Sequence, residues 1–170
     1  LKAAGAELSS ALRGLTHFRP PEGRGSRNGV EWRGGALLLI DESYNANPAS
    51  MRAALLALSS LPRDAHPRRI AVLGDMLELG LQARALHEGL ADAIEGAGVD
   101  RVFACGPNMR HLYEALPEAR RGAWAPSSAE LQPTLIAALE GGDVGMIKGS
   151  NGSRMAPLGA AVKTLADKAA

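Results

Sequence analysis

Short apolar runs alternate with longer amphipathic segments along most of this chain of 170 residues. The apolar runs are nearly continuous, which is typical of strands that are covered on both faces of a sheet. Glycine, proline or charged residues bound most of them and mark where the strands end. The pattern predicts strands at 30–32, 36–40, 68–73, 101–105, 121–125 and 143–147.

The segments between these strands carry helical spacing and helix end signals. Asn47 can cap a helix whose first position is Pro48, and a glycine ends the helix that begins at Gly80. The first two strands lie too close together for a helix, so a glycine turn is expected to join them as a hairpin. Helices are predicted at 47–61, 80–98, 108–116, 127–142 and 156–170.

The alternation of strand and helix predicts an α/β fold. Its sheet is expected to be open and mostly parallel, with helices on both faces. Ligands bind such sheets at the carboxyl ends of the strands, beside the point where the strand order reverses. Candidate chemistry is therefore expected where the strands end.

The first 22 residues do not follow this alternation. An amphipathic helix is predicted there, with Leu8, Leu12 and Leu15 on one face. A stretch rich in proline, glycine and arginine follows, as in a link between domains. We expect 1–22 to be the end of another domain with its link, and 23–170 to be the main domain. The chain starts within a helical pattern and without methionine, so we expect it to be part of a longer protein.

Composition narrows the classes of function. The net charge is only +1, which gives no global positive field for nucleic acid. The locally basic stretches at 19–29 and 62–69 are interpreted as solvated loops. No apolar run approaches the roughly 20 residues of a membrane span. The single cysteine, Cys105, excludes a disulfide within the chain, suits a reducing compartment, and is expected to be buried.

Two strands end in polar segments that exceed the needs of a short connection. "DESYNANP" at 41–48 offers carboxylates for a ribose diol or a cation, and amides that donate and accept hydrogen bonds. "KGSNGSRM" at 148–155 combines glycines with Lys148 and Arg154 ahead of a helix, as in a cradle for phosphate or carboxylate. Helix capping and a glycine turn explain these segments equally well, so both interpretations stay open.

A third strand ends in "GDMLELG" at 74–80. Asp75 and Glu78 could bind metal or bridge domains, while a capped turn is an equal alternative. His87 is isolated, which favours a structural role. Several common sites are absent from the sequence: there is no "GxxxxGK[ST]" loop, no "GxGxxG" after a strand, no "GxSxG" elbow and no zinc-ligand spacing. No metal ligand is assigned.

Taken together, these segments resemble the Mur ligase family. "LLLIDESYNANPASMRAAL", "RRIAVLGDMLELG" followed by "HEGL", "VDRVFACG" and "IKGSNGSRM" stand in the family's order and cover nearly the whole chain. The resemblance is strongest to the member that adds D-alanyl-D-alanine. The tripeptide-forming relative has a "DNPR" motif, in place of which this chain has "GPNMR". The resemblance implies a C-terminal, Rossmann-like domain in a cytoplasmic enzyme of peptidoglycan synthesis.

The resemblance also implies a reaction. ATP, with Mg²⁺, phosphorylates the carboxylate of a UDP-N-acetylmuramoyl tripeptide, and the amine of D-alanyl-D-alanine attacks the acyl phosphate to give an amide. The partners are the N-terminal and central domains of the same enzyme, and the central domain holds most of the ATP and Mg²⁺. Residues 1–22 would end that central ATPase domain. We expect the isolated chain to be inert as a ligase.

The resemblance assigns roles to individual residues. Glu42 stands where the family usually has aspartate for the ribose, so that contact could shift or pass to Asp41. Lys148 and Arg154 are the candidate catalytic residues, for the dipeptide carboxylate or a developing oxyanion. The nucleotide-binding candidates are Arg24, Asp41, Glu42, Asn45 and Asn47, and the substrate-binding candidates are Tyr44, Lys148, Ser150, Asn151 and Arg154.

Two other classes of function stay open from the residues alone. A stand-alone Rossmann-like module would bind a nucleotide or metabolite without catalysis and without a partner domain. A pure interaction domain would use the polar strand ends only as helix caps, so changing Glu42 or Lys148 to alanine would leave the full-length protein's activity unchanged.

Overall fold

The computed structural model describes residue 5 and residues 20–165. The predicted first helix, with Leu8, Leu12 and Leu15, lies outside the described residues. So does the end of the last predicted helix, from 166 onward.

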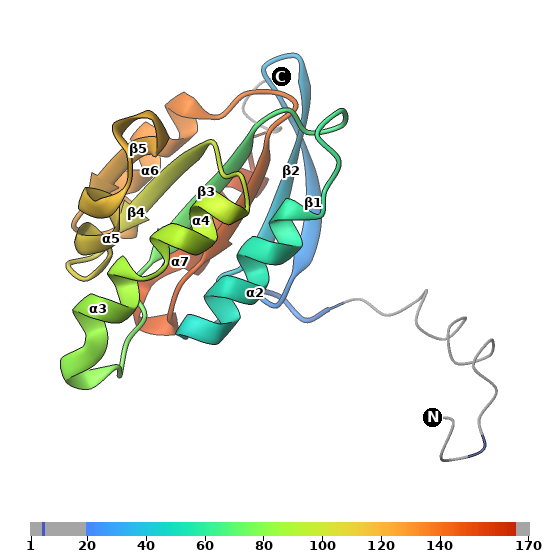
Figure 1. Ribbon diagram of the computed structural model, residues 1–170. Helices are drawn as coiled ribbons and strands as arrows, with labels where there is room; N and C mark the ends of the chain where they lie inside the picture. The colour runs from blue at the N-terminus through green and yellow to red at the C-terminus, as the bar shows by residue number, and fades with distance from the viewer. Residues whose placement is uncertain (1–4, 6–19, 166–170) are drawn as a thin grey trace.

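Six strands form one sheet in the described part of the chain (Figure 1), in the order β1-β2-β6-β3-β4-β5. β1 and β2 form the predicted antiparallel hairpin, and all other neighbouring strands are parallel. The predicted open, mostly parallel α/β sheet is thus confirmed. The strands are β1 (Ser26–Trp32), β2 (Gly35–Glu42), β3 (Arg69–Gly74), β4 (Arg101–Cys105), β5 (Arg121–Ala125) and β6 (Val144–Lys148).

Strand β1 begins earlier than the sequence pattern predicted. Its first residue, Ser26, lies in the basic stretch 19–29 that was interpreted as a solvated loop. Ser26 is opposite Asp41 and Trp32 is opposite Gly35, so β1 pairs with nearly the full length of β2. Pairing with an apolar strand therefore outweighs the weak strand propensity of a glycine- and arginine-rich segment.

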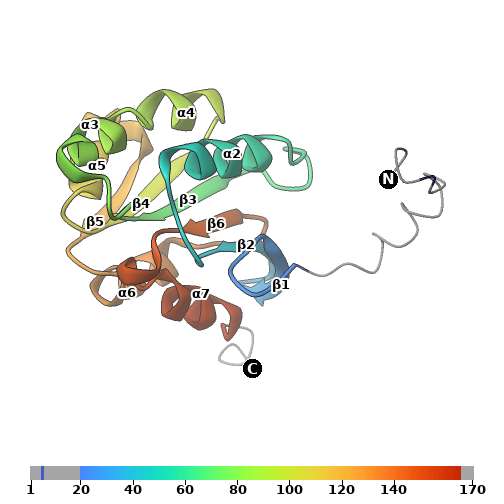
Figure 2. The same ribbon diagram turned by 90° about the horizontal axis from the view of Figure 1, so that it is seen from below.

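Helices cover both faces of the sheet (Figure 2). One face carries α2 (Pro48–Ser59), α3 (Ala83–Glu88), α4 (Ala91–Gly96) and α5 (Met109–Ala115), and the other carries α6 (Ser128–Ala138) and α7 (Met155–Lys163). Each face has its own buried aliphatic core. Short 3-10 turns lie at η2 (Gly80–Gln82), η3 (Glu118–Arg120) and η4 (Asn151–Ser153). Among the described residues no helix is both long and apolar enough to span a membrane.

The single helix predicted at 80–98 is wrong. The chain forms η2, then α3, and breaks at Gly89 and Leu90 before α4. The amide of Leu90 bonds to the carbonyl of His87, three residues back, which tightens the turn. Leu90 and Ile94 are both fully buried. Leu90 and Ile94 lie four residues apart on one helical face, and together they pack α4 against the core.

The predicted start of α2 at Pro48 is confirmed, with Asn47 as its cap. The Asn47 Oδ1 accepts from the Ser50 amide at 2.8 Å, and the Ser50 Oγ accepts from the Asn47 amide at 3.0 Å. This reciprocal pair satisfies two amides that the helix itself cannot. It fixes where the polar segment after β2 ends.

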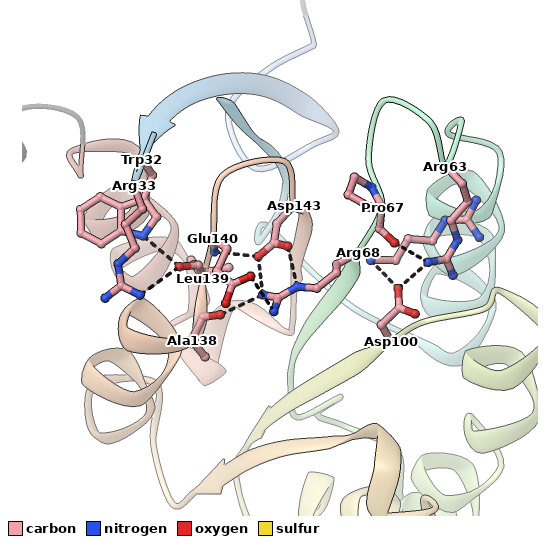
Figure 3. A network of polar contacts seen from close by, with 11 residues as sticks. Trp32, Arg33, Arg63, Pro67, Arg68, Asp100, Ala138, Leu139, Glu140 and Asp143 are labelled. Carbon is pink, nitrogen blue, oxygen red and sulfur yellow. Dashed lines mark hydrogen bonds and ion pairs between the residues drawn. The ribbon is translucent and has the colours of Figure 1, made fainter. Parts of the chain in front are cut away.

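Side chains fasten the amino-terminal end of the sheet (Figure 3). Arg68 makes a two-pronged ion pair with the buried carboxylate of Asp143, with both N–O distances 2.8 Å, and also meets Glu140 at 3.1 Å. The Trp32 indole donates to the Leu139 carbonyl at 3.0 Å. These contacts join the β1–β2 turn, the start of β3 and the turn before β6. The groups at this end have structural partners, and the candidate site lies at the opposite end.

Candidate functional site

The polar segments singled out in the sequence meet at the carboxyl-terminal edge of the sheet, the lower end in Figure 1. Strand β6 lies between β2 and β3, and Lys148 stands beside Glu42 on one side and Leu73 on the other. The helices after β2 and β3 cover one face, and the helix after β6 covers the other (Figure 2). This is the kind of reversal point at which α/β sheets bind ligands.

A pocket of about 330 Å³, which we call the link pocket, gathers most of the nucleotide-binding candidates. The Arg24 guanidinium lies 3.9 Å from the centre of the Tyr44 ring, a cation–π contact. The pocket is lined by Gly23, Arg24, Glu42, Tyr44, Asn45, Ala46, Asn47, Ser50 and Lys148.

The backbone places Arg24 in this pocket. The Tyr44 amide donates to the Gly23 carbonyl at 3.0 Å, and the Gly25 amide donates to the Asp41 carbonyl at 2.8 Å. Gly23 has φ +72°, and a Cβ there would come within 2.9 Å of the Tyr44 nitrogen. Glycine is therefore required for this close approach. From Gly23 onward the link is docked against the segment after β2.

Asp41 and Glu42 are separated by the structure. Asp41 is buried and accepts from Lys163 Nζ and from Ser43 Oγ, both at 2.6 Å. Burial acts to raise the pKa of Asp41, but the hydrogen bonds from Lys163 and Ser43 outweigh it, so the pKa lies below the ordinary 3.8. Glu42 lines the link pocket. Of the two carboxylates, Glu42 is the one that a ligand in the link pocket could meet.

A second pocket of about 500 Å³, the loop pocket, shares the wall formed by Tyr44 to Asn47. Asn151 is exposed on its far side. Ser150 is buried, and its Oγ accepts from the Leu77 amide at 2.9 Å. The loop pocket is lined by Tyr44, Asn45, Ala46, Asn47, Leu77, Glu78, Leu79, Ser150, Asn151 and Gly152.

A third pocket of about 540 Å³, the acceptor pocket, lies beyond the ends of β3 to β6. Arg154 lines it and has φ +53° at the start of α7, and Ser127 caps the start of α6. Most of this lining was missed in the sequence, although Gly106–Asn108 and Pro126–Ser128 also follow strand ends. The lining residues are Asp75, Leu77, Cys105–Asn108, Pro126–Ala129 and Gly152–Arg154.

The Mur ligase, glutamate ligase domain family matches residues 30–151. The chain belongs to this family. The UDP-N-acetylmuramoyl-tripeptide–D-alanyl-D-alanine ligase of Rickettsia prowazekii is 33% identical over 117 residues, which are 69% of this chain and 25% of that protein. The Escherichia coli ligase of the same name is 41% identical over 78 residues, 46% of this chain and 16% of its own length. The chain thus spans about a quarter or less of these two relatives.

Solved structures of Mur ligases share the fold. MurF from Acinetobacter baumannii superposes with a TM-score of 0.74 at 27% identity, covering 95% of this chain and 35% of that one. MurF ligase from Thermotoga maritima, solved in complex with ADP, gives 0.70 at 21% identity and covers 95% and 37% of the two chains. At 21% identity the second likeness supports the fold alone. The resemblance found in the sequence motifs is confirmed, while the boundary at residue 22 stays a prediction.

Two other polar residues of this Mur ligase domain have structural partners. Asp75 accepts from the amides of Asn108 and Met109, at 3.2 and 2.7 Å, and so caps α5. His87 is fully buried between the Met76 amide, 3.0 Å from Nε2, and the Ala83 carbonyl, 2.6 Å from Nδ1. The structural alternatives for Asp75 and His87 are thus favoured over a ligand-binding role.

Cys105 is buried as predicted, and burial, with the charge of Asp75, raises the pKa of its thiol to about 12. The thiol is therefore inert at neutral pH. Among residues 20–165 no group of three or more His, Cys, Asp or Glu side chains could hold a metal ion.

Proposed function

We propose that this chain is the C-terminal part of an ATP-dependent ligase that joins D-alanyl-D-alanine to a UDP-N-acetylmuramoyl tripeptide in the cytoplasm. The names of the relatives support this substrate pair. The observation that carries the proposal is the link pocket, where Arg24 from the link meets Glu42, Tyr44 and Asn45 from the segment after β2. A pocket at the entry of the chain is well placed to be one wall of a site completed by a preceding domain.

The link pocket has the chemistry of a nucleotide wall. Arg24 can pair with a phosphate through charge-assisted hydrogen bonds. Glu42 can accept hydrogen bonds from both hydroxyls of a ribose, and the exposed Asn45 and Tyr44 offer an amide and a ring for the base. Glu42 is the only carboxylate among the residues that line this pocket, and no described group of three or more His, Cys, Asp or Glu side chains could hold a metal ion. We therefore assign the ion to the preceding domain.

The acceptor pocket suits the incoming dipeptide. Arg154 can pair with its carboxylate, and the amide ends of α6 and α7 favour an anion there. Pro107, Pro126 and Ala129 supply apolar walls of a size that suits methyl side chains. With its carboxylate held, the dipeptide amine would attack the acyl phosphate carbon. The new C–N bond gives a tetrahedral intermediate, which collapses to the amide as the C–O bond breaks; phosphate leaves and takes up the proton that the amine loses.

Ligation by the full-length protein tests the proposal, with Arg24→Ala beside Arg27→Ala. Both arginines are exposed and lie close in sequence, but only Arg24 lines the link pocket. We expect Arg24→Ala to raise KM for ATP by roughly tenfold or more, as for a lost charge-assisted bond. Arg27→Ala should leave it unchanged. An equal KM for ATP in the two variants would contradict the proposal that the link pocket binds the nucleotide.

Ligand titration of the chain alone separates the proposal from a stand-alone binding module. Amide shifts on adding Mg-ADP should centre on Arg24, Glu42 and Asn45, and those on adding D-alanyl-D-alanine on 152–154. Tight binding of Mg-ADP by the chain alone, together with no ligation by the full-length protein, would favour the binding module.

A further inference from the structure

Lys148 points back into the protein. Only 4% of its side chain is exposed. Its Nζ donates to the Asn45 carbonyl at 3.0 Å and lies 3.4 Å from a Glu42 carboxylate oxygen. A buried ammonium group needs hydrogen-bond partners within the protein, because an unpaired charge is energetically costly away from water. One partner, Glu42, is the last residue of β2, and the other, Asn45, lies in the segment that follows it.

Ser150 holds the same segment one residue further along. Its Oγ donates to the Ala46 carbonyl at 3.2 Å and accepts from the Leu77 amide at 2.9 Å. Its own amide donates to the Asp75 carbonyl at 3.0 Å. Ser150 therefore ties together the loops after β2, β3 and β6.

The held segment, 43–47, has no helix or strand of its own. Lys148, at the end of β6, and Ser150, just after it, fix two successive carbonyls, those of Asn45 and Ala46. Fixing a carbonyl fixes its peptide plane, and with it the direction of the neighbouring side chains. The two fixed planes join Asn45 to Ala46 and Ala46 to Asn47, and all three of these residues line both the link pocket and the loop pocket.

We propose that Lys148 and Ser150 are positioning residues that hold the segment 43–47 in the geometry that receives the nucleotide. This inference rests on the proposed function, but it gives Lys148 a different role from contact with the dipeptide or the reacting atoms. The two side chains act through the Asn45 and Ala46 carbonyls, and it is the held segment, not Lys148 or Ser150, that contacts the nucleotide.

Steady-state kinetics of the full-length ligase test this role with Lys148→Met, Lys148→Arg, Ser150→Ala and the Met/Ala double variant. Lys148→Met should raise KM for ATP by roughly tenfold or more while kcat stays within about threefold. Lys148→Arg, which keeps a charged donor, should recover part of the loss. Because both residues hold one segment, the double variant should resemble the worse single variant instead of multiplying the two effects.

Three results would overturn the inference, two from kinetics and one from thermal unfolding combined with kinetics. A kcat that falls about a hundredfold with unchanged KM would place Lys148 at the reacting atoms. Independent, multiplying effects in the double variant would mean that the two residues do not act through one segment. A lowered Tm with unchanged KM for ATP would leave both residues with a purely structural role.

Hydrogen exchange in the ligand-free chain tests the positioning without reference to the ligase reaction. Lys148→Met and Ser150→Ala should each speed exchange of the amides at 43–47 by roughly tenfold, with amides in β4 unchanged. Unchanged exchange at 43–47 would overturn the inference even if Arg24→Ala behaves as proposed. Absence of ligation by the wild-type protein would instead refute the proposed function and leave the exchange result to decide the positioning.

Discussion

At the scale of residues, neighbours in sequence take opposite tasks because strand side chains alternate between faces. Asp41 lies beneath α7, bonded to Lys163, while Glu42 lines the link pocket. The Lys163 ammonium also lies 3.7 Å from Glu22 in the link. One buried carboxylate therefore helps to tie α7 to β2, while the next residue lines the link pocket, 3.4 Å from the Lys148 ammonium.

Asp41→Asn should lower the free energy of unfolding at pH 7 by roughly 1–3 kcal/mol, because a buried, charge-assisted pair is lost. The pKa of Asp41 is lower in the folded state than its ordinary 3.8. Its stabilising contribution is therefore fully present above pH 3.8 and is lost as the pH falls through the lower, folded value. Urea unfolding at pH 7 and in steps below pH 4 should show the wild type and the variant converging in acid.

The matched control is Asp64→Asn, which changes an exposed aspartate. It should leave the urea midpoint unchanged at pH 7. A constant difference between wild type and Asp41→Asn at every pH would contradict the role of the ionised carboxylate.

At the scale of elements, one buried arginine joins two helix ends to the central sheet. The Arg69 guanidinium, at the start of β3, donates to the Ser59 and Leu61 carbonyls at the end of α2, at 2.7 and 2.8 Å. It also donates to the Ala97 carbonyl after α4, at 2.9 Å. Positive charge is favourable at helix C-termini, where carbonyls lack partners within the helix.

Arg69→Met should lower the free energy of unfolding by roughly 2–4 kcal/mol, since one buried and two partly buried carbonyls lose their donor. Chemical denaturation measures this loss. Arg84→Met is the control, because Arg84 is exposed and pairs with Glu88, four residues on. It should leave the midpoint unchanged. Equal denaturation midpoints for the two variants would contradict the role of Arg69 in joining the two helix ends to the sheet.

At the scale of the whole molecule, the two ends of the sheet differ in what their side chains do. Arg68 and Asp143 lock the amino-terminal end of the sheet (Figure 3). The link pocket, the loop pocket and the acceptor pocket lie side by side at the other end, sharing Tyr44, Leu77 and Gly152 among their walls. That arrangement fits two ligands brought close together.

The chain alone should show no ATP-dependent ligation, whereas the full-length protein should ligate. The physical reason is that "GxxxxGK[ST]", the loop that holds the phosphates of ATP, stands nowhere in the 170 residues. Release of phosphate in the presence of ATP, tripeptide and dipeptide measures the difference. Turnover by the chain alone, equal to that of the full-length protein, would contradict the prediction.

Local signals in the sequence determined most of the elements. Apolar runs placed the strands, and Asn47 with Pro48 fixed the start of α2, because caps and strand periodicity depend on a few adjacent residues. The same motifs, in order, established the family. Sequence also located the polar segments that meet at one edge of the sheet.

Only the tertiary structure decided what those segments do. The break at Gly89 and Leu90, between α3 and α4, is a feature that the amphipathic pattern of 80–98 did not predict. The burial of Asp41, the inward direction of Lys148 and the lining of the acceptor pocket depend on strands far apart in sequence. The local pattern of residues determines the type of an element and where it ends. The order in which the strands pack decides which partner a polar side chain reaches.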